Sequence, residues 1–498
     1  MSEPAGRIRP SHLLGLWCLL FLAHPVASPA GAEFVYLLGP FRRAFPEFLA
    51  GDWTLAGGSE KAVVFDILFS YPMRLFPLAV VGVIGRGLGL LVLGWLLLRL
   101  GRWLGVGPIA TTVAVAGWLV AGQSLVGGEE VVTTLQPKLL AYAAWLAALD
   151  RVLAGRARWA GLGLGLAFSI HPSVGLAAGF ATGVGILALG WRGRQVAECL
   201  GFAALGALPG LVPLVSTVGG NGMSRAEWKW QALVRSPTHL EVFGFSLAGM
   251  VVAASLLAFT LAVVRRRPSE PSLRFILVVQ GALGALFLAG VLARTLGRYE
   301  LLSIYPFRVF PWFVLLTSLL LVARLFADRR IRPARWPEIA LALPLLLLAP
   351  KVGRLVSARI AEVRTAWGPD DDLARTFQWI ADSTPEGTPV ILPPWRRDSY
   401  LLARRPQVIS HEFLRLDSLT PWRERLEDLI GPTTNPWSPV ARRHYLQLSM
   451  DQVERIRRRY RGDYLVSSRD YPFRPVFRAG EWVVYRVPDG DVAAGQSR

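Results

Sequence analysis

Long apolar segments separated by short polar connectors make up most of the first 350 residues. A helix that crosses a bilayer needs about 20 apolar residues, so each segment near that length is a candidate span. The segment 159–190 is too long for one helix, and it is interrupted by His171-Pro172, where proline removes a backbone donor and disfavours helix at the preceding residue. We therefore expect two short helices there and about eleven spans in all. The expected spans are 12–30, 84–104, 108–126, 138–153, 159–190 counted twice, 196–218, 243–264, 274–293, 306–326 and 336–350.

The apolar run 62–81 is not expected to cross the membrane. Asp66, Pro72, Arg74 and Pro77 interrupt it, and a charge at the bilayer centre costs about 2.5–3.5 kcal/mol on insertion scales. We expect this run to lie along the membrane surface as an amphipathic helix.

The pattern changes at about Pro350, where charged and turn-forming residues replace the apolar segments. Helical patterns then alternate with short strand patterns, which favours a small α/β domain over 351–498. Together with the apolar segments, this predicts a membrane all-α fold over 1–350 followed by that domain. The expected helices are 371–383, 422–430 and 450–461, and the expected strands are 390–394, 408–410, 463–468 and 481–487.

Composition agrees with a membrane protein, because 53% of the residues are apolar and only 18% are charged, with a mean hydropathy of +0.40. The net charge of +19 comes from arginines clustered between apolar segments. Such clusters mark the cytoplasmic loops of membrane proteins. Membrane orientation therefore explains the positive charge, and we predict membrane lipids and no nucleic acid as partners. The N-terminus is then cytoplasmic and the domain 351–498 extracytoplasmic. The clusters are Arg99 and Arg102, 151–158, Arg192 and Arg194, 265–267, and 329–335.

Three further features carry no chemistry of their own. Residues 7–32 are either a cleaved signal peptide or a retained first helix, and both put the following loop outside. The GLGLG run at 161–165 lacks the strand and helix of a nucleotide-binding turn, so we interpret it as small-residue helix packing. Cys18 and Cys199 both lie in apolar segments and are not expected to form a disulfide or a metal site.

Acidic residues mark two of the predicted outer loops. In the first loop, 31–83, Asp52 is followed by Trp53, and this pair is placed to act on a molecule bound at the lipid surface. A solvated loop carboxylate is the alternative. In the loop between the third and fourth spans, Glu129 and Glu130 have the oxygen ligands that a hard cation prefers, or they form a plain solvated turn.

Basic groups mark other predicted outer positions. Arg294 and Arg298 stand at the end of a span, where a guanidinium matches phosphate in a bidentate fork or anchors the helix at the interface. His171 lies at a helix break, which is tolerated at membrane depth beside protein or a water-filled cavity. His411-Glu412 in the tail is an acid-base pair by composition, although a structural role is the more frequent outcome for such a pair.

These features together resemble the GT-C class of membrane glycosyltransferases: an initial helix, two acidic outer loops, paired short helices, about eleven spans and a soluble outer domain. The phrases FVYLLGPFRRAFPEFLAGDW, FSIHPSVG, VRSPTHL, ILPPWRRDSYLLARRPQVISHEF and PWRERL also resemble a bacterial family of multi-spanning membrane proteins of that architecture. The resemblance implies that Asp52 activates an acceptor. It also implies that Glu129 and Glu130 are similar to a second acidic motif, with a divalent cation as the possible cofactor.

The resulting expectation is a glycosyltransferase of the bacterial inner membrane that takes a sugar from a polyprenyl-phosphate-linked donor at the outer face. Asp52 is then the base, while Trp53, His171, Arg294 and Arg298 bind substrate. A transporter is the first alternative, since broken helices and ionisable residues at membrane depth are also transporter features. A non-catalytic scaffold in envelope polysaccharide assembly is the second.

Overall fold

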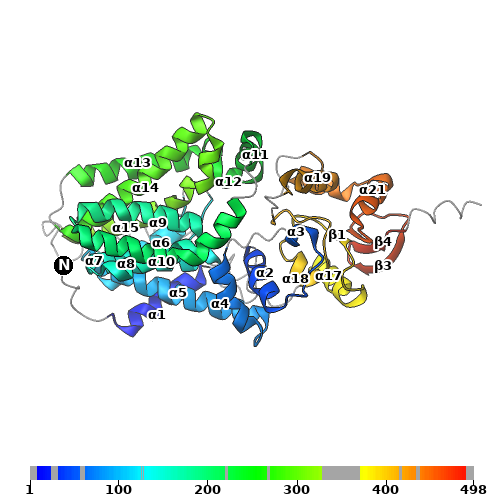
Figure 1. Ribbon diagram of the computed structural model, residues 1–498, viewed down its shortest axis with the longest axis horizontal. Coiled ribbons are helices and arrows are strands. Elements are labelled where there is room, and N and C mark those ends of the chain that lie inside the picture. The colour runs from blue at the N-terminus through cyan, green and yellow to red at the C-terminus, as the bar shows by residue number, and fades with distance from the viewer. Residues whose placement is uncertain are drawn as a thin grey trace, which may run out of the picture.

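The computed structural model contains a long helical bundle and a smaller mixed domain at one end of it (Figure 1). We call the second part the tail domain, and the end of the bundle next to it the tail-facing end. The boundary predicted at residues 350 and 351 and the span predicted at 336–350 lie outside the described residues. The structure describes residues 8–23, 32–56, 62–124, 126, 128–218, 223–265, 270–327, 371–413, 418–432 and 438–488.

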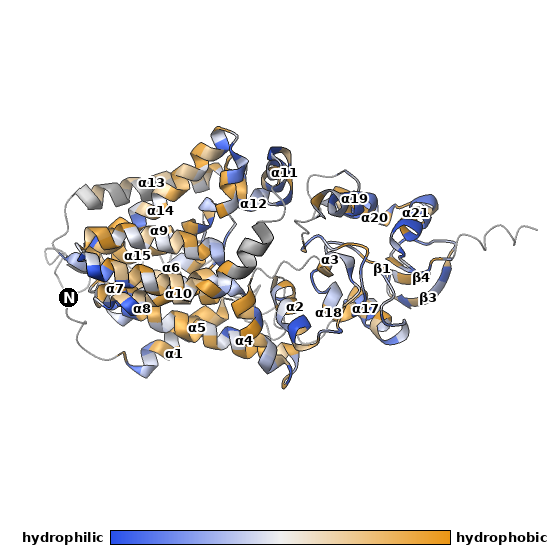
Figure 2. Cartoon of the chain, viewed as in Figure 1, coloured by the Kyte–Doolittle hydropathy of each residue, from blue (hydrophilic) through white to orange (hydrophobic). Residues whose placement is uncertain are grey.

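The bundle helices follow the apolar segments of the sequence, and Figure 2 shows that apolar residues dominate them. Short helices and turns at the tail-facing end connect the long ones. The long helices are α1 (Pro10–Leu22), α5 (Leu78–Trp103), α6 (Pro108–Val120), α7 (Pro137–Leu153), α8 (Ala157–Ile170), α9 (Pro172–Ala188), α10 (Gly193–Val218), α13 (Leu247–Arg265), α14 (Pro271–Thr295) and α15 (Phe310–Ala327). The short ones are α2 (Ala32–Ala44), α3 (Trp53–Ala56), α4 (Val63–Met73), α11 (Arg225–Trp230), η1 (Gln231–Arg235), α12 (Pro237–Leu240), η2 (Val242–Gly244), η3 (Tyr299–Ile304) and η4 (Pro306–Val309).

The break at His171-Pro172 is confirmed, because α8 ends at Ile170 and α9 begins at Pro172. The helix-packing interpretation of GLGLG is confirmed as well. A Cβ atom added at Gly161 would lie 2.1 Å from the carbonyl oxygen of Cys199, and one added at Gly165 would lie 2.2 Å from that of Ala203. The backbones of α8 and α10 therefore touch along a stripe that accepts only glycine.

Three helical segments of the described chain are both long and apolar enough to cross a membrane, Leu78–Trp103, Pro271–Thr295 and Tyr299–Ala323. The predicted count of about eleven spans is therefore not confirmed. α4 has 11 residues, and at 1.5 Å per residue it measures about 16 Å, which is too short to cross a bilayer. α5 begins at Leu78, directly after Pro77, so the predicted loop 31–83 ends earlier than expected.

Consecutive long helices run antiparallel, so the short connectors 104–107, 154–156 and 189–192 share the end of the bundle away from the tail domain (Figure 1). Two of these connectors contain predicted arginine clusters. The longer connectors lie at the tail-facing end, and every candidate residue of the membrane part belongs to one of them or to the end of an adjoining helix. The fold thus gathers these side chains beneath the tail domain.

The tail domain is a mixed α/β unit, in agreement with the sequence pattern. Its four strands have the order β1-β2-β4-β3, with β1 parallel to β2 and the other pairs antiparallel. The strand expected at 408–410 is wrong, because these residues form no strand, and the isolated bridge beside them joins Val390 to Gln407. β3 was not expected, since Pro475 breaks its pattern, and proline is accepted because β3 is an edge strand. The elements are α17 (Asp372–Ser383), β1 (Val390–Ile391), α18 (Ser399–Ala403), α19 (Leu419–Ile430), α20 (Pro439–Leu446), α21 (Met450–Tyr460), β2 (Tyr464–Ser467), β3 (Arg474–Ala479) and β4 (Trp482–Arg486).

Candidate functional site

The connector between α6 and α7 is folded around the buried side chain of Gln123. Its Oε1 accepts hydrogen bonds from the backbone N–H groups of Val131 and Val132, at 2.9 and 2.8 Å. Its Nε2 donates to the carbonyl oxygen of Val132 at 2.8 Å. Further along, the N–H of Leu135 donates to Glu33 Oε1 of α2 at 2.8 Å. These bonds satisfy backbone groups that are out of water, and they fix the connector so that Glu129 lies inside the protein.

Glu129 is the centre of a buried ionic cluster at the tail-facing end. Only 1% of its side chain is exposed. Lys138 Nζ, from the first turn of α7, lies 2.6 Å from Oε1, and Arg308 Nε, from η4, lies 3.0 Å from Oε2. His239 Nδ1, from α12, lies 4.0 Å from Oε2. We call these four residues the Glu129 cluster.

The cluster carries more positive than negative charge. Burial raises the pKa of Glu129, but Lys138, Arg308 and His239 together lower it to about 2. The carboxylate is therefore ionised at neutral pH, and it faces the ammonium group of Lys138 and the guanidinium of Arg308 before His239 is counted. An excess of buried positive charge is costly unless an anion joins it. The cluster therefore has the electrostatic character of an anion site, and guanidinium and ammonium groups are the side chains that bind phosphate.

Tyr305 holds the guanidinium of Arg308 in place. It adopts the left-handed conformation, with φ 55° and ψ 58°, at the junction of η3 and η4. Arg308 Cζ lies 3.9 Å from the centre of its ring, and the His239 ring lies 6.5 Å away in an edge arrangement. A non-glycine residue in this conformation costs about 1–3 kcal/mol and occurs preferentially at functional sites.

Arg235 extends the positive region toward the tail domain. The hydroxyl groups of Tyr36 and Tyr305 lie near the guanidinium groups of both Arg235 and Arg308. Arg235 Nη2 donates to the carbonyl oxygens of His411 and Glu412 at 3.5 and 3.3 Å. One arginine therefore belongs both to the surroundings of the Glu129 cluster and to the contact with the tail domain.

His171 is the predicted site residue that the fold brings to this cluster. Burial, Arg308 and Lys138 together lower the pKa of its imidazole to about 3, while Glu129 acts in the opposite direction. Its Nδ1 lies 3.2 Å from Ser173 Oγ. The ring is therefore neutral at physiological pH and takes part in hydrogen bonding rather than in charge pairing.

Asp52 lies at the contact between the first loop and the tail domain. Its side chain is 0% exposed. Oδ1 accepts from the N–H of Leu55 at 2.8 Å and from the hydroxyl of Tyr400 at 3.2 Å, and Oδ2 accepts from the N–H of Gln407 at 2.8 Å. Burial raises the pKa of Asp52, and these hydrogen bonds oppose the rise. Asp52 therefore joins the first loop to the tail domain, and its hydrogen-bond partners belong to α3 and the tail.

Aromatic contacts strengthen the same junction. Arg425 Cζ of α19 lies 3.8 Å from the ring centre of Trp53 and 4.5 Å from that of Tyr460. The rings of Trp230 and Trp422 lie 6.1 Å apart in an edge arrangement. The tail domain is thus held by α3 on one side and by α11 on the other.

The two arginines predicted to bind phosphate have other partners. Arg294 Nε lies 2.7 Å from Glu241 Oε2, and Arg294 Nη1 donates to the Tyr299 hydroxyl at 3.3 Å. Arg298 is 61% exposed, and its Nη1 lies 3.7 Å from Glu300 Oε1. The residues that meet at the Glu129 cluster are instead Arg308 and Lys138.

A divalent cation does not fit the geometry at Glu129. Lys138 holds one of its oxygens and Arg308 the other, so a metal would meet two cations instead of further oxygen ligands. Glu130, the second residue of the predicted pair, is exposed. Across the part of the chain that the structure describes, there is no group of three or more His, Cys, Asp or Glu side chains arranged to hold a metal.

Sequence reasoning missed Lys138, Arg235, His239 and Arg308 as partners of one site. The available signal for Lys138 was the scarcity of lysine, which occurs only at 61, 138, 229 and 351. Arg308 follows the sequence YPF within the connector that also contains Arg298, and spacing alone does not separate the two arginines.

No protein-family model matches this chain, and no curated protein matches it. Among solved structures, the chain is similar to the archaeal oligosaccharyltransferase AglB from Archaeoglobus fulgidus, in complex with an inhibitory peptide and a dolichol-phosphate. The sequence identity is 12%, the match covers 92% of this chain and 69% of that chain, and the TM-score is 0.41.

Proposed function

We propose that this protein transfers a sugar from a polyprenyl-phosphate-linked donor to an acceptor, and that the Glu129 cluster binds the phosphate of the donor. The observation that carries the proposal is the excess of positive charge that Lys138 and Arg308, both partly buried, form around one buried carboxylate. The apolar bundle supports a lipid-linked substrate, because a long isoprenoid chain partitions into the same bilayer as the helices.

The reaction requires that charge be stabilised on the leaving phosphate. An acceptor oxygen bonds to the anomeric carbon, the bond from that carbon to the phosphate oxygen breaks, and its electron pair stays on the phosphate. Arg308 and Lys138 stabilise this developing charge from fixed positions. Glu129 keeps both cations in place without neutralising them completely.

The base in this proposal is Asp52, as the resemblance implies. The acceptor proton passes to its carboxylate, and the raised pKa of Asp52 suits a proton acceptor. The Tyr400 hydroxyl occupies the position of an O–H donor to Oδ1, so an acceptor hydroxyl must replace it there. Trp53 and His171 are assigned to substrate contacts. Arg294 and Arg298 contribute less to substrate binding, because they form ion pairs with Glu241 and Glu300.

Replacing Arg308 with lysine tests whether Arg308 binds the phosphate of the donor. Arg308→Lys keeps the charge beside Glu129 but loses the planar fork, and removal of one such donor is expected to lower turnover by about 10²–10³-fold. The measurement is the initial rate at which purified protein converts a polyprenyl-phosphate-linked sugar. Arg192→Ala, which removes an exposed arginine at the opposite end of the bundle, should retain the wild-type rate. Arg298→Ala should lower the initial rate less than Arg308→Lys does. The reverse order would indicate that the phosphate binds at Arg298.

One result would contradict sugar transfer as such, independently of the role of Arg308. If no lipid-linked sugar is consumed by the wild-type protein under any acceptor condition, the transferase proposal fails. Uptake of a solute into protein-containing vesicles in the same preparation would then favour a transporter.

We further propose that the protein lies in the inner membrane of a bacterium with the tail domain on the extracytoplasmic side. The arginine-bearing connectors at the opposite end of the bundle support this orientation, because basic loops stay in the cytoplasm. A reporter fused after Pro488 should report an extracytoplasmic location, and one fused after Arg192 should report the cytoplasm. The opposite pattern would reverse the orientation and place the Glu129 cluster on the cytoplasmic side.

A further inference from the structure

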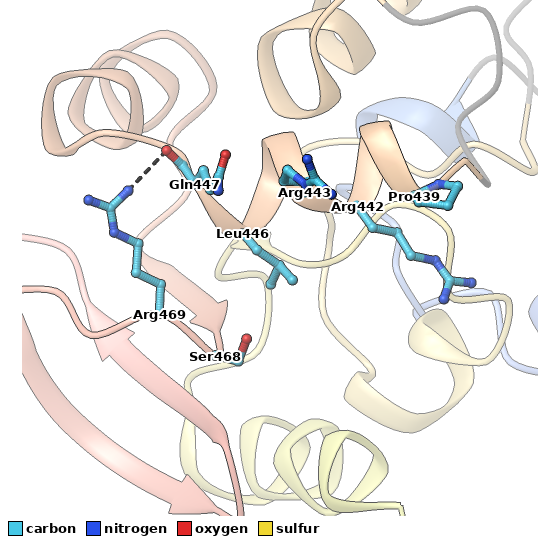
Figure 3. A pocket seen from close by; sticks show the side chains of 7 residues that line it. All are labelled: Pro439, Arg442, Arg443, Leu446, Gln447, Ser468 and Arg469. Atoms are coloured by element: carbon cyan, nitrogen blue, oxygen red, sulfur yellow. Dashed lines mark hydrogen bonds between the residues drawn. The ribbon is translucent and has the colours of Figure 1, made fainter.

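The tail domain contains a pocket that the proposed reaction does not use. It has a volume of about 510 Å³ and lies between α20 and the segment that follows β2. Figure 3 shows the side chains that line it, which come from these two parts of the chain. Ser438 caps the start of α20 by accepting a hydrogen bond from the N–H of Ala441 at 3.1 Å, so one wall of the pocket is a firmly anchored helix. The lining residues are Pro439, Arg442, Arg443, Leu446, Gln447, Ser468 and Arg469.

The charge of this pocket is entirely positive, because three of its lining residues are arginines and none is acidic. Arg469 Nη1 donates to the carbonyl oxygens of Gln447 and Leu448, both at 3.0 Å, which fixes its guanidinium, and Figure 3 shows the bond to Gln447. Arg442 Cζ lies 5.7 Å from the ring centre of Trp395. The ion pairs described in the tail domain are made by other arginines, such as Arg396 and Arg459.

The position of the pocket separates it from the Glu129 cluster. Figure 2 shows α20 on the side of α19 away from the bundle. Trp422 and Arg425 of α19, together with Tyr400 and Gln407, form contacts with the connectors of the bundle, and none of these four residues lines the pocket. A ligand that reaches the pocket therefore arrives from the water phase beyond the tail domain.

We propose that this pocket binds an anionic oligosaccharide whose sugars carry carboxylate or phosphate groups. A guanidinium recognises either group through paired N–H donors. Pro439 and Leu446 supply apolar surface for the C–H faces of sugar rings, and Gln447 and Ser468 supply polar groups for hydroxyls. The volume lies within the range of about 300–1,000 Å³ that is usual for small-ligand sites. The proposal does not depend on the transfer reaction.

The test measures binding of oligogalacturonate, which has a carboxylate on every sugar, to the full-length protein in detergent. Arg442→Ala/Arg443→Ala should raise the dissociation constant at least about tenfold, because each arginine contributes charge-assisted hydrogen bonds. The matched control is Arg455→Ala/Arg458→Ala, which removes the same charge from exposed positions of α21 and should leave the constant unchanged. A neutral glucan of the same length should not bind.

Other outcomes overturn the proposal. An equal rise of the dissociation constant in both double variants would show that only the net charge of the protein attracts the oligosaccharide. Absence of oligogalacturonate binding, combined with Arg442-dependent binding to phosphatidylglycerol vesicles, would assign the arginines to lipid headgroups. Binding of inorganic phosphate as tight as that of the oligosaccharide would show that the sugar is not recognised.

Discussion

Glu129→Gln is expected to lower the free energy of unfolding by about 3–5 kcal/mol, the usual effect of removing one partner from a buried ion pair. Glutamine has a similar shape but no charge, so Lys138 and Arg308 would remain partly buried without their counter-ion. Lys138 also lies in the first turn of α7, where the helix dipole disfavours a cation. The measurement is thermal and denaturant unfolding of the protein in detergent.

Two comparisons make this result specific to the cluster. Glu130→Gln, at the exposed neighbouring position, should change stability by less than about 0.5 kcal/mol. Adding Lys138→Met to Glu129→Gln should recover part of the loss, since removing both partners leaves fewer buried groups uncompensated. A double variant as unstable as the sum of its single variants would contradict the pairing.

The Glu129 carboxylate also makes the stability of the protein depend on pH. The folded-state pKa of Glu129, about 2, lies below its ordinary value of 4.5. Its contribution to stability is therefore complete above pH 4.5 and is lost as the pH falls toward 2. The stability difference between the wild-type protein and Glu129→Gln should shrink over this interval.

Asp52→Asn is expected to reduce sugar transfer by about 10²–10⁴-fold, the usual effect of removing a general base. The amide cannot accept the acceptor proton, although it retains one oxygen for the hydrogen bonds at this position. The measurement is the rate of donor consumption as a function of pH. Because burial raises the pKa of Asp52 above the ordinary 3.8, the acidic limb of the wild-type profile should lie above that value.

Tyr400→Phe separates chemistry from domain attachment. It removes one hydrogen bond to Asp52 and keeps the carboxylate, so it should cost about 1 kcal/mol of stability and retain most of the turnover. If Tyr400→Phe lowers the rate as much as Asp52→Asn does, then Asp52 acts by holding the tail domain and is not the base. Protease sensitivity of the tail domain should report that loss of attachment.

The tail domain shows where local pattern succeeds and where it fails. The helix α17 and the strands β2 and β4 follow the sequence pattern. α17 buries one face on the core of the domain, whereas the apolar runs of β2 and β4 are buried on both faces of the sheet. The stretch 408–410 has strand composition but forms no strand, and the isolated bridge nearby involves the preceding residue, Gln407. Strand composition is a local property, whereas strand formation depends on a neighbour with free backbone groups.

The amino-acid sequence alone determined the apolar bundle, the break at His171-Pro172 and the presence of a mixed α/β tail domain after the bundle, because these follow from hydrophobicity and from proline over short distances. The tertiary structure alone decided the partners of each charge. It placed Glu129 between Lys138 and Arg308, and Arg308 is far away in the chain. It also placed Asp52 where its carboxylate accepts hydrogen bonds from Tyr400 and Gln407 of the tail domain. A carboxylate has the same side chain whether it is solvated, catalytic or a counter-ion, and only the groups that the fold brings within a few ångströms determine which of these it is.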